Sequence, residues 1–108
     1  MIDWTRVARL REEIGEDDFD EVVELFLEEV DDAIDALQNS ADPDALEARL
    51  HFLKGSALNL GFDRFSSHCQ HGEKLAARGC PERIDLGGIV ESYARSKIVF
   101  LDQLEKHC

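Results

Sequence analysis

From residue 17 to residue 37 the apolar residues recur every three or four positions, which is the period of an amphipathic helix and not the alternation of a strand. The positions that follow this period are Phe19, Val22, Val23, Phe26, Val30, Ala33, Ile34 and Leu37. Nowhere does the chain alternate apolar and polar residues over a stretch long enough to favour a strand. The sequence therefore predicts an all-α protein, and this segment is its clearest helix.

Four further helices follow from the same period and from residues that start or stop helices. The five expected ranges are 4–13, 17 or 18 onwards, 43–61, 63–78 and 82–106. Gly15 is a plausible end of the first helix, and Gly61 ends the third. Asp42 and Pro43 match a cap followed by a first-turn proline, and Asp63 can cap the fourth helix.

The fifth expected helix has an apolar side made of Leu86, Ile89, Val90, Tyr93, Phe100, Leu101 and Leu104. Gly87 and Gly88 weaken its first turns, so a later start is an alternative. The connections between helices are short, which favours antiparallel neighbours. Residues 1–108 are thus expected to form a single domain, an antiparallel up-down four-helix bundle with a short extra N-terminal helix.

The net charge of −12 argues against direct binding of DNA or RNA, whose phosphates the chain would repel. No apolar run predicts a signal peptide or a membrane span. The three cysteines, Cys69, Cys80 and Cys108, are odd in number and irregularly spaced. This usage suits a reduced cytoplasm and argues against a disulfide framework.

The charge is concentrated in the first half of the chain. Residues 1–50 hold 17 acids and 4 bases, a net charge of −13, whereas residues 51–108 hold 7 acids and 8 bases, a net charge of +1. The balanced half begins at His51 and would not repel a partner rich in carboxylates. The simpler interpretation is that the acidic half keeps the protein in solution.

Residues 51–61, which read HFLKGSALNLG, place a histidine on the outside of the third expected helix. A step of about 100° per residue gathers the apolar positions into one stripe, formed by Leu46, Leu50, Leu53, Ala57 and Leu60. His51 lies about 140° from the centre of this stripe and is therefore expected to face solvent. Lys54 and Gly55 follow at i+3 and i+4, on the same side of the helix.

This arrangement suits phosphoryl transfer. An exposed imidazole is mostly neutral, and hence nucleophilic, near neutral pH. Lys54 could neutralise part of the charge of a phosphoryl group on His51. Gly55 costs a helix about 1 kcal/mol relative to alanine, which indicates a compensating role such as close approach of a partner. Ser56 is either a hydrogen-bond donor or a small packing residue.

Leu58 and Phe62 fall within about 20° of His51 on the helical wheel, which makes them a candidate docking surface for a partner protein. Phe62 follows Gly61, where the wheel no longer strictly applies, so a core position for Phe62 is an equal alternative.

A metal site is not expected from the histidines and cysteines. His68 and His71 are separated by only three positions, and no CxxC, HExxH or Glu-x-x-His motif occurs. We expect Cys69 to be a small core residue and the two histidines to lie on the surface.

The segment His-Phe-Leu-Lys-Gly-Ser-Ala at residues 51–57, followed by Gly61, resembles the histidine-containing phosphotransfer (HPt) domain of multistep two-component phosphorelays. The resemblance extends over residues 3–80, with Gly15 to Phe19 and the helix of Phe26 upstream and Cys69 and Glu73 downstream. In one departure, Gly72 stands where the family usually has an apolar residue.

The resemblance implies a cytoplasmic phosphocarrier. His51 would accept a phosphoryl group on Nε2 from a receiver aspartyl-phosphate and pass it to the aspartate of another response regulator. Glu73 would accept a hydrogen bond from Nδ1–H of His51. The carrier would have no cofactor of its own, because the receiver supplies Mg²⁺. Its partners would be receiver domains of hybrid sensor kinases and response regulators, and the carrier is expected to be a monomer.

Other functions remain open at this point. The chain has no phosphate-binding glycine loop, so it is not expected to be an ATP-dependent kinase. The alternatives are an adaptor of the same fold that binds receivers without transfer, a metal-binding helical bundle, and a purely structural adaptor.

Overall fold

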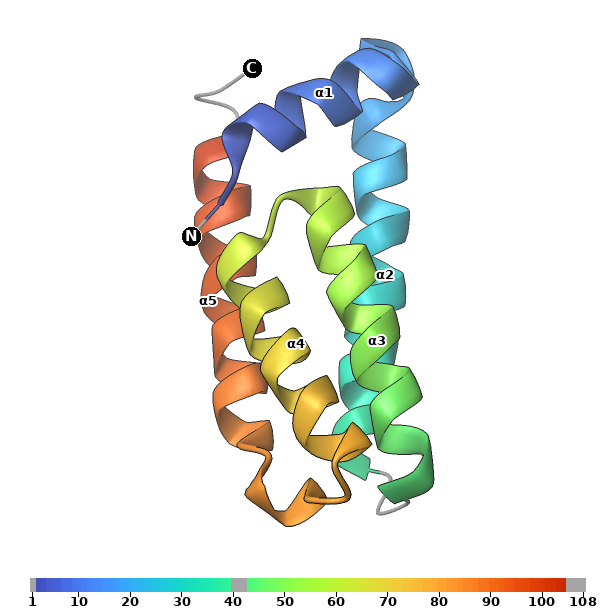
Figure 1. Ribbon diagram of the computed structural model, residues 1–108. Helices are drawn as coiled ribbons and strands as arrows, with labels where there is room; N and C mark the ends of the chain where they lie inside the picture. Colours follow the sequence, from blue (N-terminus) through green and yellow to red (C-terminus); the bar gives the residue numbers. More distant parts are fainter. Residues whose placement is uncertain (1, 40–42, 105–108) are drawn as a thin grey trace.

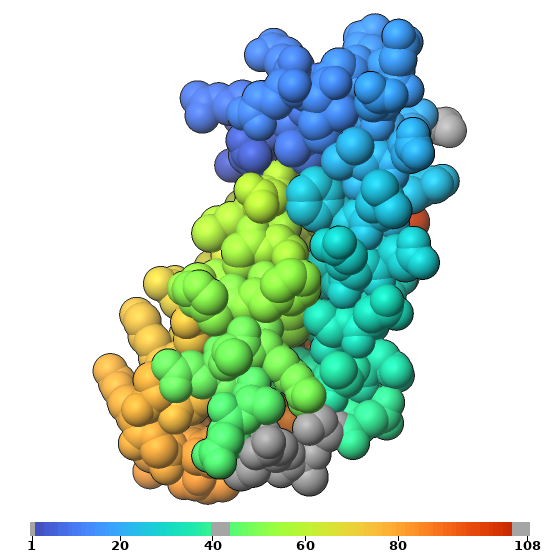
Figure 2. All heavy atoms as spheres, turned by 90° about the vertical axis from the view of Figure 1, so that its right-hand side faces the viewer, coloured from blue at the N-terminus to red at the C-terminus, as the bar shows by residue number. Residues whose placement is uncertain are grey.

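The computed structural model describes residues 2–39 and 43–104, and within them it has five α-helices and one 3₁₀ turn. The elements are α1 (Trp4–Ile14), α2 (Glu16–Asn39), α3 (Pro43–Leu60), α4 (Asp63–Ala77), η1 (Pro81–Arg83) and α5 (Leu86–Leu104). Helices α2 to α5 run alternately down and up the bundle, and α1 lies across one end (Figure 1). Figure 2 shows α2 and α3 side by side on one face. The expected all-α bundle is confirmed.

Glycines end the first and third helices, as expected. Gly15 and Gly61 have φ angles of 95° and 79°, in the left-handed region that glycine adopts without strain. A Cβ on Gly61 would lie 2.6 Å from the carbonyl oxygen of Asp3. The Asp3 N–H also donates to the Gly61 carbonyl at 2.7 Å, so the start of α1 is fixed to the turn between α3 and α4. Helix α3 begins at Pro43, and its expected cap, Asp42, lies outside the described residues.

The starts of the last two helices differ from expectation. The cap of α4 is Phe62, while Asp63 is the first helical residue and its carboxylate accepts from the Arg64 N–H at 2.7 Å. Helix α5 begins at Leu86, which confirms the alternative of a start later than residue 82, because residues 81–83 form a separate 3₁₀ turn. The Asp85 carboxylate accepts from the Gly88 N–H at 2.9 Å and satisfies a donor in the first turn of α5.

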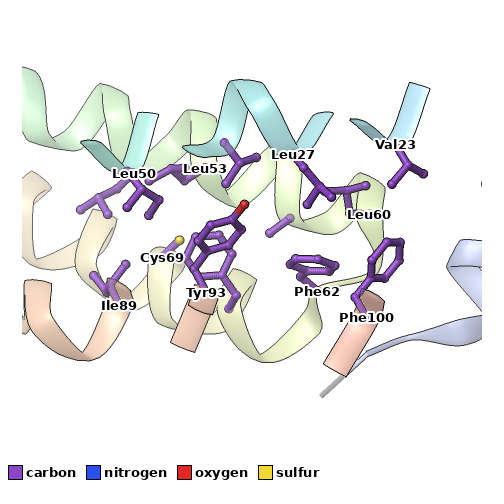
Figure 3. Packing of buried hydrophobic residues seen from close by; sticks show 14 of the residues in the cluster. Val23, Leu27, Leu50, Leu53, Leu60, Phe62, Cys69, Ile89, Tyr93 and Phe100 are labelled. Carbon is purple, nitrogen blue, oxygen red and sulfur yellow. The ribbon is translucent and has the colours of Figure 1, made fainter. Parts of the chain in front are cut away.

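Leu101, which was expected on the buried side of α5, is exposed, and Phe62, which was a candidate docking residue, is buried. Leu101 is 49% exposed, because the neighbouring Phe100, about 100° away around α5, occupies the buried position. Phe62 is fully buried, with its ring centroid 5.2 Å from that of Phe100 and 6.2 Å from that of Tyr93 (Figure 3). The turn at Gly61 redirects the chain and brings Phe62 into the core. Phe62 is therefore not part of a docking surface.

The core is formed by the apolar stripes of all four long helices. The α3 stripe predicted from the sequence, Leu46, Leu50, Leu53, Ala57 and Leu60, is buried throughout. From α2 the buried residues are Phe19, Val23, Leu27, Val30, Ile34 and Leu37. At the α1 end of the bundle, Trp4 stacks on Phe100 with ring centroids 5.8 Å apart. The burial of these apolar stripes provides most of the driving force for folding.

A polar contact joins α2 to α5 at the edge of this core. The hydroxyl of Tyr93 donates to Oδ1 of Asp31 at 2.6 Å, and Nζ of Lys97 lies 2.9 Å from Oδ2. Desolvation raises the pKa of Asp31, but the hydrogen bonds from Lys97 and Tyr93 outweigh it and leave this pKa below its usual value. The ionised carboxylate thus fixes how α5 lies along α2.

Candidate functional site

His51 stands on the outer face of α3, opposite the stripe that α3 buries. Its side chain is 68% exposed, as the helical wheel predicts. One ring nitrogen, Nδ1, lies 2.7 Å from Oε2 of Glu73 on α4. The other, Nε2, has no hydrogen-bond partner within the described part of the chain. The imidazole is therefore held at one nitrogen, and the second is accessible to a partner.

The carboxylate of Glu73 binds two side chains of α3 at once. Its second oxygen, Oε1, accepts from Nζ of Lys54 at 2.7 Å, the same distance that separates Oε2 from the ring of His51. The side chains of Glu73 and Lys54 are 18% and 24% exposed, so the pair is partly shielded from solvent. The contact between Lys54 and Glu73 was not anticipated from the sequence.

This pairing lowers the pKa of Glu73. The hydrogen bond from Lys54 is the largest cause, and the hydrogen bond with His51 and the electrostatic influence of Lys54 and His51 act in the same direction. Partial burial raises the pKa but is outweighed. Glu73 is therefore ionised at neutral pH and can only accept hydrogen bonds.

An ionised carboxylate at Nδ1 determines which ring nitrogen carries the proton. Because Glu73 has no proton to donate, Nδ1 of His51 must be the donor in the 2.7 Å hydrogen bond. In the neutral ring the lone pair then resides on Nε2, the solvent-facing nitrogen. The geometry thus makes Nε2 the nucleophilic atom.

Close packing of α3 on α4 places Glu73 beneath His51. Gly72 is buried, and a Cβ there would lie 3.1 Å from Cδ1 of Leu50 and 3.2 Å from Cδ1 of Ile89. The methyl groups of neighbouring helices therefore occupy the space that a side chain would need. Gly72 stands directly before Glu73, where the family usually has an apolar residue. In this chain the side chains of Leu50, Ile84 and Ile89 occupy the space beside it.

The residues that follow Lys54 differ in their surroundings. Gly55 is exposed, and a Cβ there would meet nothing within 4 Å, so no packing contact in the described structure explains a glycine at this position. Ser56 is only 8% exposed, which favours a small packing residue over a surface donor.

Two apolar side chains are exposed near His51 on α3. Leu58 is 54% exposed, as the wheel predicts, and Phe52 is 45% exposed. Phe52 was not identified from the sequence, although its wheel position, about 100° from His51 and away from the buried stripe, contains the signal. The surface around His51 is therefore partly apolar, which is typical of protein interfaces.

The two histidines and the cysteine of α4 are not arranged around a common point. His68 and His71 are exposed, whereas Cys69 is fully buried. Burial, together with the nearby charge of Glu73, raises the pKa of the Cys69 thiol to about 12. Among the residues the structure describes, no three histidine, cysteine or acidic side chains are grouped to hold a metal ion.

Comparison with known proteins gives one match. The family model of the Hpt domain matches residues 21–106, which include α3 with His51 and α4 with Glu73. No curated protein and no solved structure matches the chain. No helix in the described part of the chain is long and apolar enough to cross a membrane.

The paired Glu73 carboxylate should make stability depend on acid. Because its folded pKa lies below the unfolded value, the stabilisation is present above the unfolded pKa and is lost as pH falls through the folded one. We expect Glu73→Gln to lower the free energy of unfolding by about 1 kcal/mol at neutral pH and by less near pH 3. Urea unfolding at the two pH values measures this difference. Glu82→Gln, at an exposed position on η1, is the control, and an equal loss for Glu73→Gln at both pH values would contradict the account.

Proposed function

Because the chain belongs to the Hpt domain family, we propose that it is a phosphocarrier in a multistep two-component phosphorelay. His51 accepts a phosphoryl group from the aspartyl-phosphate of one receiver domain and passes it to the aspartate of another. The observation that carries this proposal is the exposed Nε2 of an imidazole whose Nδ1 is hydrogen-bonded to Glu73. The family match supports phosphotransfer as the general function, and the site geometry supports His51 as the acceptor.

The transfer step follows from this geometry. The lone pair of Nε2 attacks phosphorus while the bond from phosphorus to the aspartyl oxygen breaks, and the receiver carboxylate leaves with the bonding electrons. The ring keeps its proton on Nδ1 and gains positive charge, which the Glu73 carboxylate at 2.7 Å stabilises. Transfer to a second receiver is the reverse sequence with a different aspartate. Positioning and electrostatics supply the catalysis, since no proton must leave the ring for either step.

Lys54 keeps the surroundings of His51 from becoming negative. A bare carboxylate next to the histidine would repel an incoming phosphoryl group, but the Lys54 ammonium 2.7 Å from Glu73 offsets that charge. The same ammonium lies one turn from His51, where it can also attract phosphoryl oxygens. Lys54 therefore both neutralises Glu73 and stabilises the phosphorylated state.

The remaining components of the reaction belong to the partners. We assign Mg²⁺ and the acceptor aspartate to receiver domains of a hybrid sensor kinase and of response regulators. The carrier works as a cytoplasmic monomer and does not use ATP. The competing function is a receiver-binding adaptor of the same fold, and phosphorylation of His51 separates the two.

Phosphotransfer from a receiver tests this proposal. Receiver domains from the source genome are phosphorylated with acetyl phosphate and Mg²⁺, freed of excess donor, and mixed with wild type or with His51→Gln. We expect wild type to gain one acid-labile phosphoryl group by intact mass and His51→Gln to gain none, because the amide is not a nucleophile. A variant that is phosphorylated as fast as wild type would contradict His51 as the acceptor. Receiver binding without transfer to wild type would support the adaptor.

Gly55 provides a second test, because the bundle does not require a glycine there, whereas close approach of a receiver does. Gly55→Ala should raise the free energy of unfolding by about 0.5–1 kcal/mol, since alanine favours a helix interior and a Cβ at this position meets no clash. Gly55→Leu should slow transfer at least about tenfold by preventing the receiver from approaching closely. The measurements are urea unfolding and kcat/KM for transfer. Ala94→Leu, at an exposed position on α5, should leave transfer unchanged, and a Gly55→Leu carrier as fast as wild type would exclude close approach at this position.

A further inference from the structure

The outer face of α2 carries an apolar groove that no part of the described bundle covers. Val22, Leu25, Phe26 and Glu29 line a shallow hollow of about 150 Å³. Leu25, which points outward from the helix, is 54% exposed. Exposed apolar side chains that line a groove mark candidate interaction surfaces.

The groove lies on α2, the helix beside α3, which carries His51. Nη1 of Arg49 donates to the carbonyl of Ala36 at 3.3 Å, so Arg49 of α3 lies beside Ala36 of α2. Because α2 and α3 run antiparallel (Figure 2), Leu25 is level with the end of α3, about 13 Å along the axis from His51 at a rise of 1.5 Å per residue. A protein partner covers about 800 Å² on each side of an ordinary interface. One receiver docked over His51 can therefore also cover the groove.

The acidic residues around the groove indicate that its occupant is positively charged. Helix α2 contains eleven acidic residues and no basic residue. Three of the acids, Glu21, Glu28 and Glu29, stand at i−4, i+3 and i+4 from Leu25 and so surround it on the helix surface. A complementary partner surface must have an apolar side chain among basic ones. A second copy of this chain docked through the same face is disfavoured, because it would present the same acidic helix.

We propose that this groove binds the basic flank of the receiver domain that exchanges phosphoryl groups with His51. An exposed apolar side chain of the receiver, set among lysines and arginines, fills the hollow between Val22, Leu25 and Phe26. The acidic rim then selects receivers that carry such a flank and orients them with the aspartate over His51. This inference rests on the proposed function and adds to it the kind of receiver that the carrier accepts.

Binding measurements on matched variants test the groove separately from the chemistry. The receiver that wild type phosphorylates with the highest kcat/KM is used, and all binding is measured in a His51→Gln background so that no transfer occurs. The groove variants are Leu25→Ser and a triple variant, Glu21→Gln, Glu28→Gln and Glu29→Gln. The matched control for Leu25→Ser is Ile98→Ser, since Ile98 is 68% exposed on α5. The control for the triple variant is Asp20→Asn, Glu82→Gln and Glu91→Gln, which has the same change in net charge. Asp20 lies about 140° around α2 from Leu25, and Glu82 and Glu91 are exposed on η1 and α5.

We expect the groove triple variant to slow receiver association about tenfold at low salt and to lose most of its salt dependence, whereas the control triple changes association less than about twofold. Leu25→Ser should weaken the affinity about fivefold, and Ile98→Ser should leave it unchanged. Equal effects of the groove and control variants would overturn the proposal, as would a Leu25-dependent dimer of the carrier in sedimentation.

The groove assignment and the proposed function can be tested separately. If wild type transfers to the receiver but the groove variants bind it normally, only the groove assignment is wrong. If wild type exchanges no phosphoryl group with any receiver, the proposed function is wrong, and the assignment of a receiver to the groove is overturned with it.

Discussion

The packing of α3 against α4 is the contact on which the site depends. Leu50 of α3 rests against the backbone of α4 at Gly72, where a side chain would be crowded by neighbouring methyl groups. This close approach brings the next residue of α4, Glu73, within 2.7 Å of both His51 and Lys54. A wider spacing between the helices would leave the imidazole without its partner and its proton free to occupy either nitrogen. The buried side of α3 thus determines the chemistry on its exposed side.

The molecule separates stability from function around the circumference of α3. The stripe that includes Leu50, Leu53 and Leu60 is fully buried and binds the helix into the bundle. The opposite face presents His51, an uncovered glycine at Gly55 and exposed apolar side chains, none of which the core requires. Because a rigid bundle supports this face, partners can meet a preformed surface, which limits the entropy lost on docking.

Much of this could be predicted from the sequence, because the decisive signals are local. The period of apolar residues predicted the buried stripe of α3 and hence the exposure of His51. The glycines predicted the ends of α1 and α3. Phe62 was ambiguous, since the turn at Gly61 removes the helical geometry from which its direction was inferred. The contact between Lys54 and Glu73 joins two helices and has no signature in the spacing of either one. Leu25 was missed although the helical wheel places it about 150° from the centre of the buried α2 stripe, because a single outward leucine predicts no groove.

The central claim is that Glu73 holds the proton of His51 on Nδ1 and leaves Nε2 as the nucleophile. Long-range ¹H–¹⁵N correlation spectra of the imidazole at a pH where the ring is neutral test this claim directly, because protonated and unprotonated ring nitrogens differ widely in chemical shift. We expect wild type to show a protonated Nδ1 and an unprotonated Nε2, and Glu73→Ala to lose this strict preference. A ring protonated on Nε2 in wild type, or one whose tautomers are unaffected by Glu73→Ala, would contradict this claim.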